Sequence, residues 1–228
     1  DNYELPNMTA YNETCAAISM VYLFERMFLL HGESKYIDCM ERTLYNGVIS
    51  GMSMDGGRFF YPNPLSSDGK YAFNADNTKT RQPWFGCACC PSNLCRFIPS
   101  VPGYLYGVKD NNIYVNLFAG NTSTIKVNGK DVVLEETTEY PWNGDIKIAV
   151  KKSGVKNANL LVRIPGWVRN QVVPSDLYKY SDAEKPAYTV TVNGKAVEAD
   201  LDANKGYLPV KNIKKGDVIR IHFDMPIR

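Results

Sequence analysis

The chain has 228 residues, of which 44% are hydrophobic and 22% are charged, and its net charge is +2. This composition is typical of a soluble globular protein with one large domain or two modest ones. The basic residues are few and scattered, which argues against nucleic acid as a partner. No apolar run approaches the roughly 20 residues that span a bilayer, so a membrane is not expected as a partner either. The sequence does not distinguish a cytoplasmic from a periplasmic location.

The first part of the chain shows helical periodicity. Apolar residues between Ala16 and Leu30 predict a helix that begins near Thr9, ends at His31-Gly32 and is apolar nearly all round. A second helix is predicted from about Ser34 to Ile49. Two consecutive helices of this character need more helices around them than the chain provides.

A long irregular segment is predicted after these helices. Residues 52–86 are rich in glycine and proline, and within them Arg58-Phe59-Phe60-Tyr61 predicts one short strand. Pro91 favours the first turn of a third, short helix, which Pro99 and Pro102 bring to an end.

After about Gly107 the apolar periodicity changes to two, which is typical of strands. Asn128-Gly129 and Asn193-Gly194 each separate two strand-like segments and predict hairpins. The predicted fold class is therefore α+β, with a helical domain over residues 1–107 and an antiparallel β-sandwich over residues 108–228. The strands are predicted at residues 113–118, 123–127, 146–150, 160–164, 188–192 and 218–223.

The most informative stretch is Cys87-Ala88-Cys89-Cys90-Pro91, with three thiols in four positions. Such a cluster can bind a soft metal such as zinc or supply a nucleophile. If Pro91 lies in the first turn of a helix, Cys89 and Cys90 lie at its N-terminus, where the helix dipole favours anionic sulfur. All six cysteines lie in the first 95 residues, a distribution that favours reduced or metal-bound thiols over disulfides.

A second group of candidate ligands is Glu13-Thr14-Cys15. Taken alone, Glu13 is easily a capping carboxylate in the first helical turn and Cys15 a small core residue. Together with the distant thiol cluster, however, Glu13 and three thiolates make a complete tetrahedral zinc shell. One of the four thiols is then left outside the shell, and the spacing does not say which one.

Several further motifs carry a resemblance to a known family. They are Tyr3-Glu4-Leu5-Pro6-Asn7, the segment Thr9–Cys15, Met40-Glu41-Arg42, Phe59-Phe60-Tyr61, Asn63-Pro64-Leu65 and Trp84–Pro91, with Tyr140-Pro141-Trp142 and Gly206-Tyr207-Leu208 in the second half. With these motifs the sequence resembles the β-L-arabinofuranosidases of glycoside hydrolase family 127. The resemblance extends over essentially the whole chain.

The resemblance implies the last helices of an (α/α)6 barrel followed by a β-sandwich. It also implies that Cys89 is the catalytic nucleophile, that Cys87 is not a ligand, and that Glu41 and Tyr61 contact the bound sugar. The zinc (Zn2+) ligands that it implies are Glu13, Cys15, Cys89 and Cys90.

The resemblance further implies that part of the enzyme is missing from this chain. In the family, the acid that protonates the leaving group is a glutamate shortly before the position of Glu13, and here it would precede Asp1. The chain is therefore expected to be the C-terminal part of a retaining glycoside hydrolase that acts on a plant-type glycan. It is expected to need the N-terminal barrel segment of the same protein and to be inactive alone.

Two other interpretations remain open. The chain could be a non-catalytic carbohydrate-binding or scaffolding module whose cysteines bind zinc only to stabilise the fold. It could also be a disulfide-bonded extracellular domain, which the number of free thiols decides.

Overall fold

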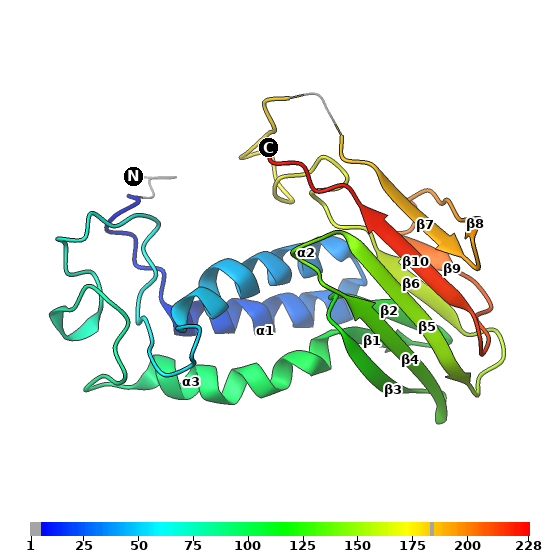
Figure 1. The fold of residues 1–228 in the computed structure, drawn as a ribbon, viewed down its shortest axis with the longest axis horizontal. Helices are drawn as coiled ribbons and strands as arrows, with labels where there is room; N and C mark the ends of the chain where they lie inside the picture. The colour runs from blue at the N-terminus through cyan, green and yellow to red at the C-terminus, as the bar shows by residue number, and fades with distance from the viewer. Residues whose placement is uncertain (1–5, 183–184) are drawn as a thin grey trace. The chain divides into compact units, whose positions relative to one another are not determined.

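A computed structural model describes residues 6–182 and 185–228, so Tyr3-Glu4-Leu5 of the first resemblance motif lies outside the described residues. The described part mixes helices with two β-sheets (Figure 1). It divides into two compact units. We call residues 1–27 with 39–102 the helical unit, and residues 28–38 with 103–228 the sandwich unit. The domain boundary predicted near residue 107 stays a prediction.

Two helices open the described fold, as the sequence predicts. Helix α1 (Thr14–His31) begins five residues later than the predicted start at Thr9. The reason is that Glu13 forms an antiparallel β-bridge with Pro62, so the backbone before Thr14 is extended. Helix α2 (Ser34–Thr43) continues as a π-helical turn and a 3-10 turn, which end at Gly51.

Helix α1 is apolar on more than one face. Within the helical unit, Ile18 and Val21 are buried, whereas Met20, Tyr22 and Leu23 are exposed. By length and composition alone α1 could cross a membrane, contrary to the expectation from the sequence. The core helix of a globular protein meets the same criterion.

The long segment between α2 and α3 is irregular, as predicted, but the strand predicted at residues 58–61 is wrong. Phe59 forms isolated β-bridges with Met52 and Gln82, and no continuous ladder follows. A single 3-10 turn (Ala75–Asn77) interrupts the segment. In this segment, side-chain hydrogen bonds replace the backbone hydrogen bonds of a β-ladder. The apolar pattern of the sequence cannot predict such side-chain bonds.

The third helix follows the prediction closely. Helix α3 (Cys89–Phe97) has Cys89 and Cys90 as its first two residues and Pro91 as its third. The α-helix ends at Phe97, and Ile98 still has α dihedral angles. Pro99 has no N–H with which to continue the helical hydrogen bonds. A 3-10 segment (Ile98–Tyr104) leads on to the sheets.

The described residues of the sandwich unit form ten strands in two sheets. Figure 1 shows how these strands are arranged. The four-stranded sheet has the order β1-β2-β6-β9, and the six-stranded sheet has the order β3-β4-β5-β10-β7-β8. The strands are β1 (Tyr106–Lys109), β2 (Asn112–Val115), β3 (Asn121–Val127), β4 (Lys130–Thr138), β5 (Asp145–Ser153), β6 (Asn159–Arg163), β7 (Tyr188–Val192), β8 (Lys195–Ala196), β9 (Tyr207–Val210) and β10 (Val218–Phe223).

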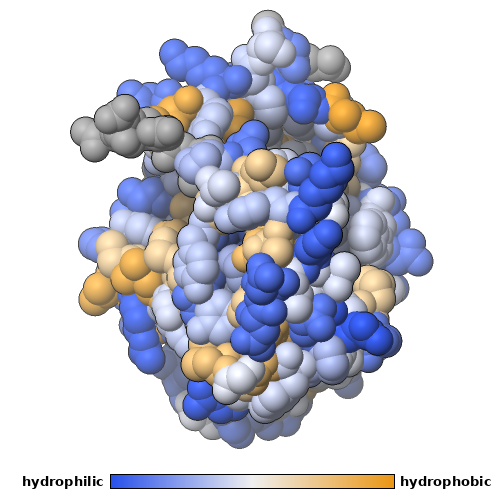
Figure 2. All heavy atoms as spheres, turned by 90° about the vertical axis from the view of Figure 1, so that its left-hand side faces the viewer, coloured by the Kyte–Doolittle hydropathy of each residue, from blue (hydrophilic) through white to orange (hydrophobic). Residues whose placement is uncertain are grey.

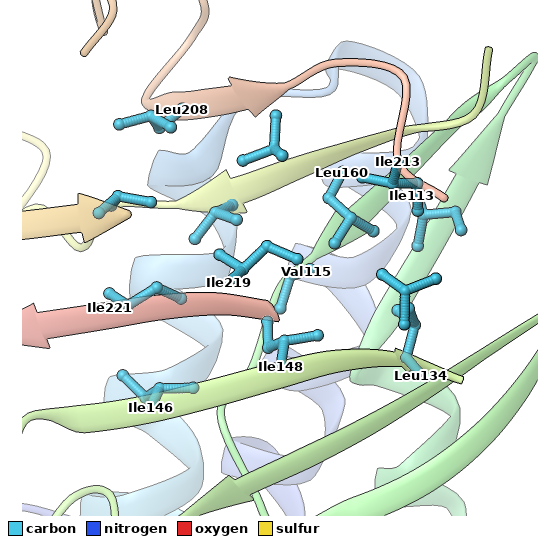
Figure 3. Close-up of a cluster of buried hydrophobic side chains, with 14 of the residues drawn as sticks. Ile113, Val115, Leu134, Ile146, Ile148, Leu160, Leu208, Ile213, Ile219 and Ile221 are labelled. Carbon is cyan, nitrogen blue, oxygen red and sulfur yellow. The ribbon is translucent and has the colours of Figure 1, made fainter. Parts of the chain in front are cut away.

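One hydrophobic core joins the two sheets. Alternate residues of β5 and β10 are buried, as the period of two predicts, and they meet buried residues of β2, β6 and β9 (Figure 3). Side chains from both sheets belong to the same buried cluster, which is the arrangement of a β-sandwich. The two predicted Asn-Gly hairpins are confirmed between β3 and β4 and between β7 and β8.

The sandwich is not wholly antiparallel, so that part of the prediction is wrong. Strands β2 and β6 pair in parallel, with Ile113 opposite Leu160. Between them the chain passes through β3, β4 and β5 of the other sheet, and this long crossover lets the returning strand run in the same direction. The (α/α)6 barrel remains a prediction, because the helices described here do not make up a barrel.

Candidate functional site

The candidate site lies in the helical unit, and its first two residues flank the start of α1. Glu13 is placed by its β-bridge to Pro62, with the Thr14 N–H donating to the Tyr61 carbonyl at 2.9 Å. Cys15 lies in the first turn of α1. Glu13 therefore precedes the helix rather than lying in its first turn, where the sequence placed it.

The other two residues are the first two of α3. The residue before the helix, Ala88, makes no side-chain capping bond, so the N–H groups of this turn keep their partial positive charge next to the sulfurs. Cys90 is fully buried and Cys89 is partly buried. The prediction that both cysteines lie at a helix N-terminus is confirmed.

Four donor groups from these two places converge. Within residues 6–182 and 185–228, one ligand atom from each of Glu13, Cys15, Cys89 and Cys90 lies within 4.8 Å of every other. Glu13 Oε1 lies 3.9 Å from Cys89 Sγ and 3.8 Å from Cys90 Sγ, and the two sulfurs are 4.0 Å apart.

The spacing and chemistry of these donors fit zinc. Tetrahedral zinc with sulfur at about 2.3 Å and oxygen at about 2.0 Å separates its ligand atoms by roughly 3.5 to 3.8 Å. Glu13 Oε1 lies 3.8 and 3.9 Å from the two sulfurs of α3, which are 4.0 Å apart, so these three atoms need only a small contraction. The ligand atom of Cys15 lies within 4.8 Å of each of them. Three thiols with one carboxylate also suit a borderline-soft cation better than calcium or magnesium, which prefer oxygen alone.

The three thiols differ in their electrostatic surroundings. Burial raises the pKa of Cys15 and raises that of Cys90 further, because a desolvated thiolate is unfavourable. Burial acts on Cys89 in the same direction, but hydrogen bonds with Tyr61, Cys15 and Cys90 outweigh it and lower the Cys89 pKa. Cys89 is thus the thiol that its protein surroundings favour as an anion.

Tyr61 belongs to this group by direct contact. Its hydroxyl lies 2.7 Å from Cys89 Sγ, and its ring packs edge-on against Phe85 with 5.8 Å between centroids. The hydrogen bond with Cys89, together with burial, raises the pKa of Tyr61. The phenol therefore stays protonated and can donate to a thiolate at position 89.

The remaining predicted residues lie elsewhere. Glu41 is buried in α2, and its carboxylate is not one of the four donors that meet. Cys87 and Cys95 are exposed and also lie outside the group of four. No disulfide joins any of the six cysteines, all of which lie in the described residues, so the disulfide-bonded interpretation is wrong for this structure.

Two cavities adjoin the cluster, and a residue that the sequence did not single out lines both. Tyr11 faces a cavity of about 670 Å³ that Glu13 also lines, and a second of about 300 Å³ that Tyr61 and Cys87 also line. Burial, together with the nearby Glu13 carboxylate, raises the pKa of Tyr11. The available signal was an aromatic residue two positions before Glu13, which by itself is too common to mark a site.

Comparison with known proteins gives a consistent result. Residues 1–103 match the model of the β-L-arabinofuranosidase GH127 catalytic domain, and residues 112–225 match that of the GH127 middle domain. The chain is 32% identical over 232 residues to the non-reducing end β-L-arabinofuranosidase of Bifidobacterium longum subsp. longum. That alignment includes 98% of this chain and 32% of the relative.

Solved structures are similar over nearly the whole chain. A GH127 β-arabinofuranosidase matches with a TM-score of 0.91 and 57% identity, over 99% of this chain and 34% of its own. The GH127 β-L-arabinofuranosidase of Geobacillus stearothermophilus T6 matches with a TM-score of 0.82 and 38% identity, over 99% of this chain and 33% of its own. The chain thus spans about a third of the length of these relatives.

Proposed function

Because the chain belongs to glycoside hydrolase family 127, we propose that it carries the metal centre and the nucleophile of a retaining β-L-arabinofuranosidase. The observation that carries this proposal is the convergence of four donors, Glu13, Cys15, Cys89 and Cys90, with the Tyr61 hydroxyl on one of the thiols. The substrate class we propose is a plant-type glycan with terminal arabinofuranosyl groups.

The four donors would hold zinc. Bound zinc would supply positive charge that keeps the coordinating thiols ionised at neutral pH. The chain's own groups act in the same place: the N-terminus of α3 and the Tyr61 hydroxyl both stabilise negative charge on Cys89.

Cys89 is the thiol we assign to the chemistry. Its thiolate would attack the anomeric carbon, forming a carbon–sulfur bond as the bond to the leaving oxygen breaks. A carboxylic acid must give that oxygen a proton and then take one from the water that cleaves the carbon–sulfur bond. Two displacements at one carbon retain its configuration. The protein thus replaces one carboxylate of the usual glycosidase pair by a thiolate.

We assign the acid and the remaining sugar-binding groups to parts of the protein outside this chain. The chain spans about a third of its relatives, and α1 exposes apolar residues such as Met20 and Leu23 that a barrel would cover. Apolar side chains reach the surface in several separate patches on the face that Figure 2 presents. We therefore expect these 228 residues alone to hydrolyse no arabinofuranoside, and measurable turnover by them would contradict this assignment.

Within the chain, Tyr61 and Glu41 are the proposed sugar contacts. The cavity of about 300 Å³ beside Tyr61 is within the size range of small-molecule sites. Glu41 keeps a buried carboxylate in α2, which suits a group that accepts hydrogen bonds from sugar hydroxyls.

The test is covalent trapping in the full-length protein. A β-L-arabinofuranosyl haloacetamide should alkylate Cys89, identified by mass spectrometry of the labelled peptide, and the substitution Cys89→Ser should remove the label. The matched control is Cys95→Ser in the same helix, whose exposed thiol lies outside the cluster and which should leave the label in place.

Covalent labelling of Cys89 also distinguishes a hydrolase from a non-catalytic module. A module whose zinc only stabilises the fold would bind the metal through the same four residues and leave Cys89 unlabelled. Zinc at one equivalent with no sugar-dependent alkylation would therefore support the module and contradict the hydrolase.

A further inference from the structure

The backbone of Tyr61 is held by a side chain, whereas the residues before it are held by backbone hydrogen bonds. The N–H groups of its neighbours bond to backbone carbonyls: Phe59 to Gln82 at 2.8 Å and Phe60 to Gly51 at 2.7 Å. The Tyr61 N–H instead donates to the side chain of Asn74, with 2.8 Å to Oδ1. A single side chain thus provides the hydrogen bond that a neighbouring strand would provide.

The Asn74 side chain is held in a fixed orientation. Its side chain is buried, with 4% of the residue exposed, and both ends of its amide are used. Oδ1 accepts from Tyr61, while Nδ2 donates to the Thr80 carbonyl at 2.9 Å, which fixes the amide plane. The Asn74 N–H in turn donates to the Thr78 carbonyl at 2.9 Å, closing the turn that carries the side chain.

The opposite edge of the segment is fixed from the start of α1. The Tyr61 carbonyl accepts from the Thr14 N–H, and the fully buried Thr14 hydroxyl donates to the Phe60 carbonyl at 3.1 Å. Asn63 Nδ2 completes the contact by donating to Thr14 Oγ1 at 2.9 Å. Thr14 lies between Glu13 and Cys15, so this edge ties Tyr61 to the two donors on α1.

We propose that Asn74 is a positioning residue that acts through Tyr61, holding the Tyr61 hydroxyl against the Cys89 sulfur. The inference rests on the proposed function for its catalytic consequence and on the hydrogen bonds above for its geometry. Asn74 fixes one edge of the Tyr61 backbone and Thr14 the other, and from this position the Tyr61 hydroxyl lies 2.7 Å from Cys89 Sγ. Small displacements of a positioned group cost up to about a hundredfold in rate.

The test is a double-mutant cycle in the full-length protein with 4-nitrophenyl β-L-arabinofuranoside. Asn74→Ala should lower kcat/KM about tenfold, mostly through kcat, when Tyr61 is intact. In the presence of Tyr61→Phe, which removes the hydroxyl, the same substitution should change kcat/KM less than about twofold. Equal losses in both backgrounds would show a general structural role and overturn the proposal.

Two further variants keep the test decisive if Asn74→Ala folds poorly. Asn74→Asp retains an oxygen for the Tyr61 N–H but turns a second oxygen towards the Thr80 carbonyl, so it should recover the lost activity only in part while keeping the Tyr61 amide protected from exchange. A Tyr61 amide that exchanges as fast as in Asn74→Ala would contradict the role of Oδ1. Thr78→Ala is the matched control, because the Thr78 hydroxyl donates to the Ala75 carbonyl within the same turn. It should leave kcat/KM within about twofold.

Two readouts that need no turnover separate a failure of this inference from a failure of the proposed function. Hydrogen exchange of the Tyr61 amide should rise at least tenfold in Asn74→Ala and stay unchanged in Thr78→Ala. The rate at which iodoacetamide alkylates Cys89 should change in Asn74→Ala only while the Tyr61 hydroxyl is present. If both hold and no arabinofuranoside is cleaved, the substrate assignment is wrong and the positioning role stands; an unchanged Tyr61 amide overturns that role.

Discussion

In the sandwich unit, apolar side chains from two sheets form one continuous buried cluster, whereas the helical unit organises its site around polar groups. Strand alternation places residues such as Ile148 and Ile219 in the sandwich core. The irregular segment that carries Tyr61 has no such alternation, and the buried amides of Asn63 and Asn74 bond to it instead. The hydrophobic effect that stabilises the sandwich core does not depend on direction. The network around Tyr61 depends on the geometry of individual hydrogen bonds.

Because of this difference, function and stability are separable in this protein. A hydrophobic core tolerates exchange among apolar residues of similar volume, so the sandwich core does not require particular apolar side chains. A buried polar network has no comparable tolerance, because each lost partner leaves an unsatisfied group. Substitutions in the helical unit should therefore act mainly on activity and metal binding, and those in the sandwich on the free energy of unfolding.

The largest expected effect is at Cys89. In the full-length protein, Cys89→Ser should lower kcat by at least about a thousandfold, because the alcohol is a far weaker nucleophile at neutral pH. The unfolding transition of the sandwich unit, followed by hydrogen exchange in β5 and β10, should not move. Cys95→Ser serves as the control on the same helix and should keep full activity. Residual activity within tenfold of the wild type would remove Cys89 from the nucleophile's role.

Removal of the metal should loosen the helical unit and leave the sandwich unit intact. A chelator should raise amide exchange in the first turns of α1 and α3 and leave β5 and β10 protected, because the four donors all lie in the helical unit. At metal concentrations about a thousand times the dissociation constant, bound zinc stabilises its unit by about 4 kcal/mol. Equal loosening of both units on chelation would show that their stabilities are not separable.

The same contrast explains which features the sequence predicted. Helix α3 and its N-terminal cysteines followed from Pro91, and the two hairpins followed from their Asn-Gly pairs, because in each case local residues dictate the backbone. Periodicity placed β5 and β10, whose buried faces alternate without interruption. Strand β4 was expected only as the second arm of the Asn128-Gly129 hairpin, without bounds, because its inward-facing alternation includes the charged residue Glu136.

The features that were wrong depend on contacts distant in sequence. The parallel pairing of β2 with β6 follows from a crossover through three strands, which no local pattern reports. The start of α1 moved from Thr9 to Thr14 because Glu13 pairs with Pro62, 49 positions along the chain. The four donors could be proposed from motifs, but the hydroxyl of Tyr61 on Cys89 and its support by Asn74 required coordinates.

A large-to-small substitution in the sandwich core should give a smaller and purely structural effect. Ile219 is fully buried between the two sheets, so Ile219→Ala should lower the free energy of unfolding by about 3 to 4 kcal/mol in denaturant titrations. Arg220→Ala, the next residue on the opposite face of β10, should change it by less than about 0.5 kcal/mol. Zinc stoichiometry should be the same in both variants. Loss of zinc from Ile219→Ala alone would show that metal binding in the helical unit depends on the stability of the sandwich unit.

The smallest expected effect tests the one carboxylate that the sandwich buries in β4. Burial raises the pKa of Glu136 to about 7, although Tyr106, Ala119 and Asn121 donate hydrogen bonds to it. The folded state therefore holds this proton more tightly than the unfolded state, in which the pKa is about 4.3.

The stability that Glu136 contributes is consequently full below about pH 4 and decreases as the pH rises towards 7. Glu136→Gln cannot ionise and should remove this dependence, so its free energy of unfolding relative to wild type should rise by about 3 kcal/mol from pH 4 to pH 8. Parallel pH profiles for the two proteins in denaturant titrations would show that Glu136 has the same pKa in the folded and in the unfolded state. The polar group would then be as well accommodated in the sandwich as the amides are beside Tyr61, and the contrast between the two units would weaken.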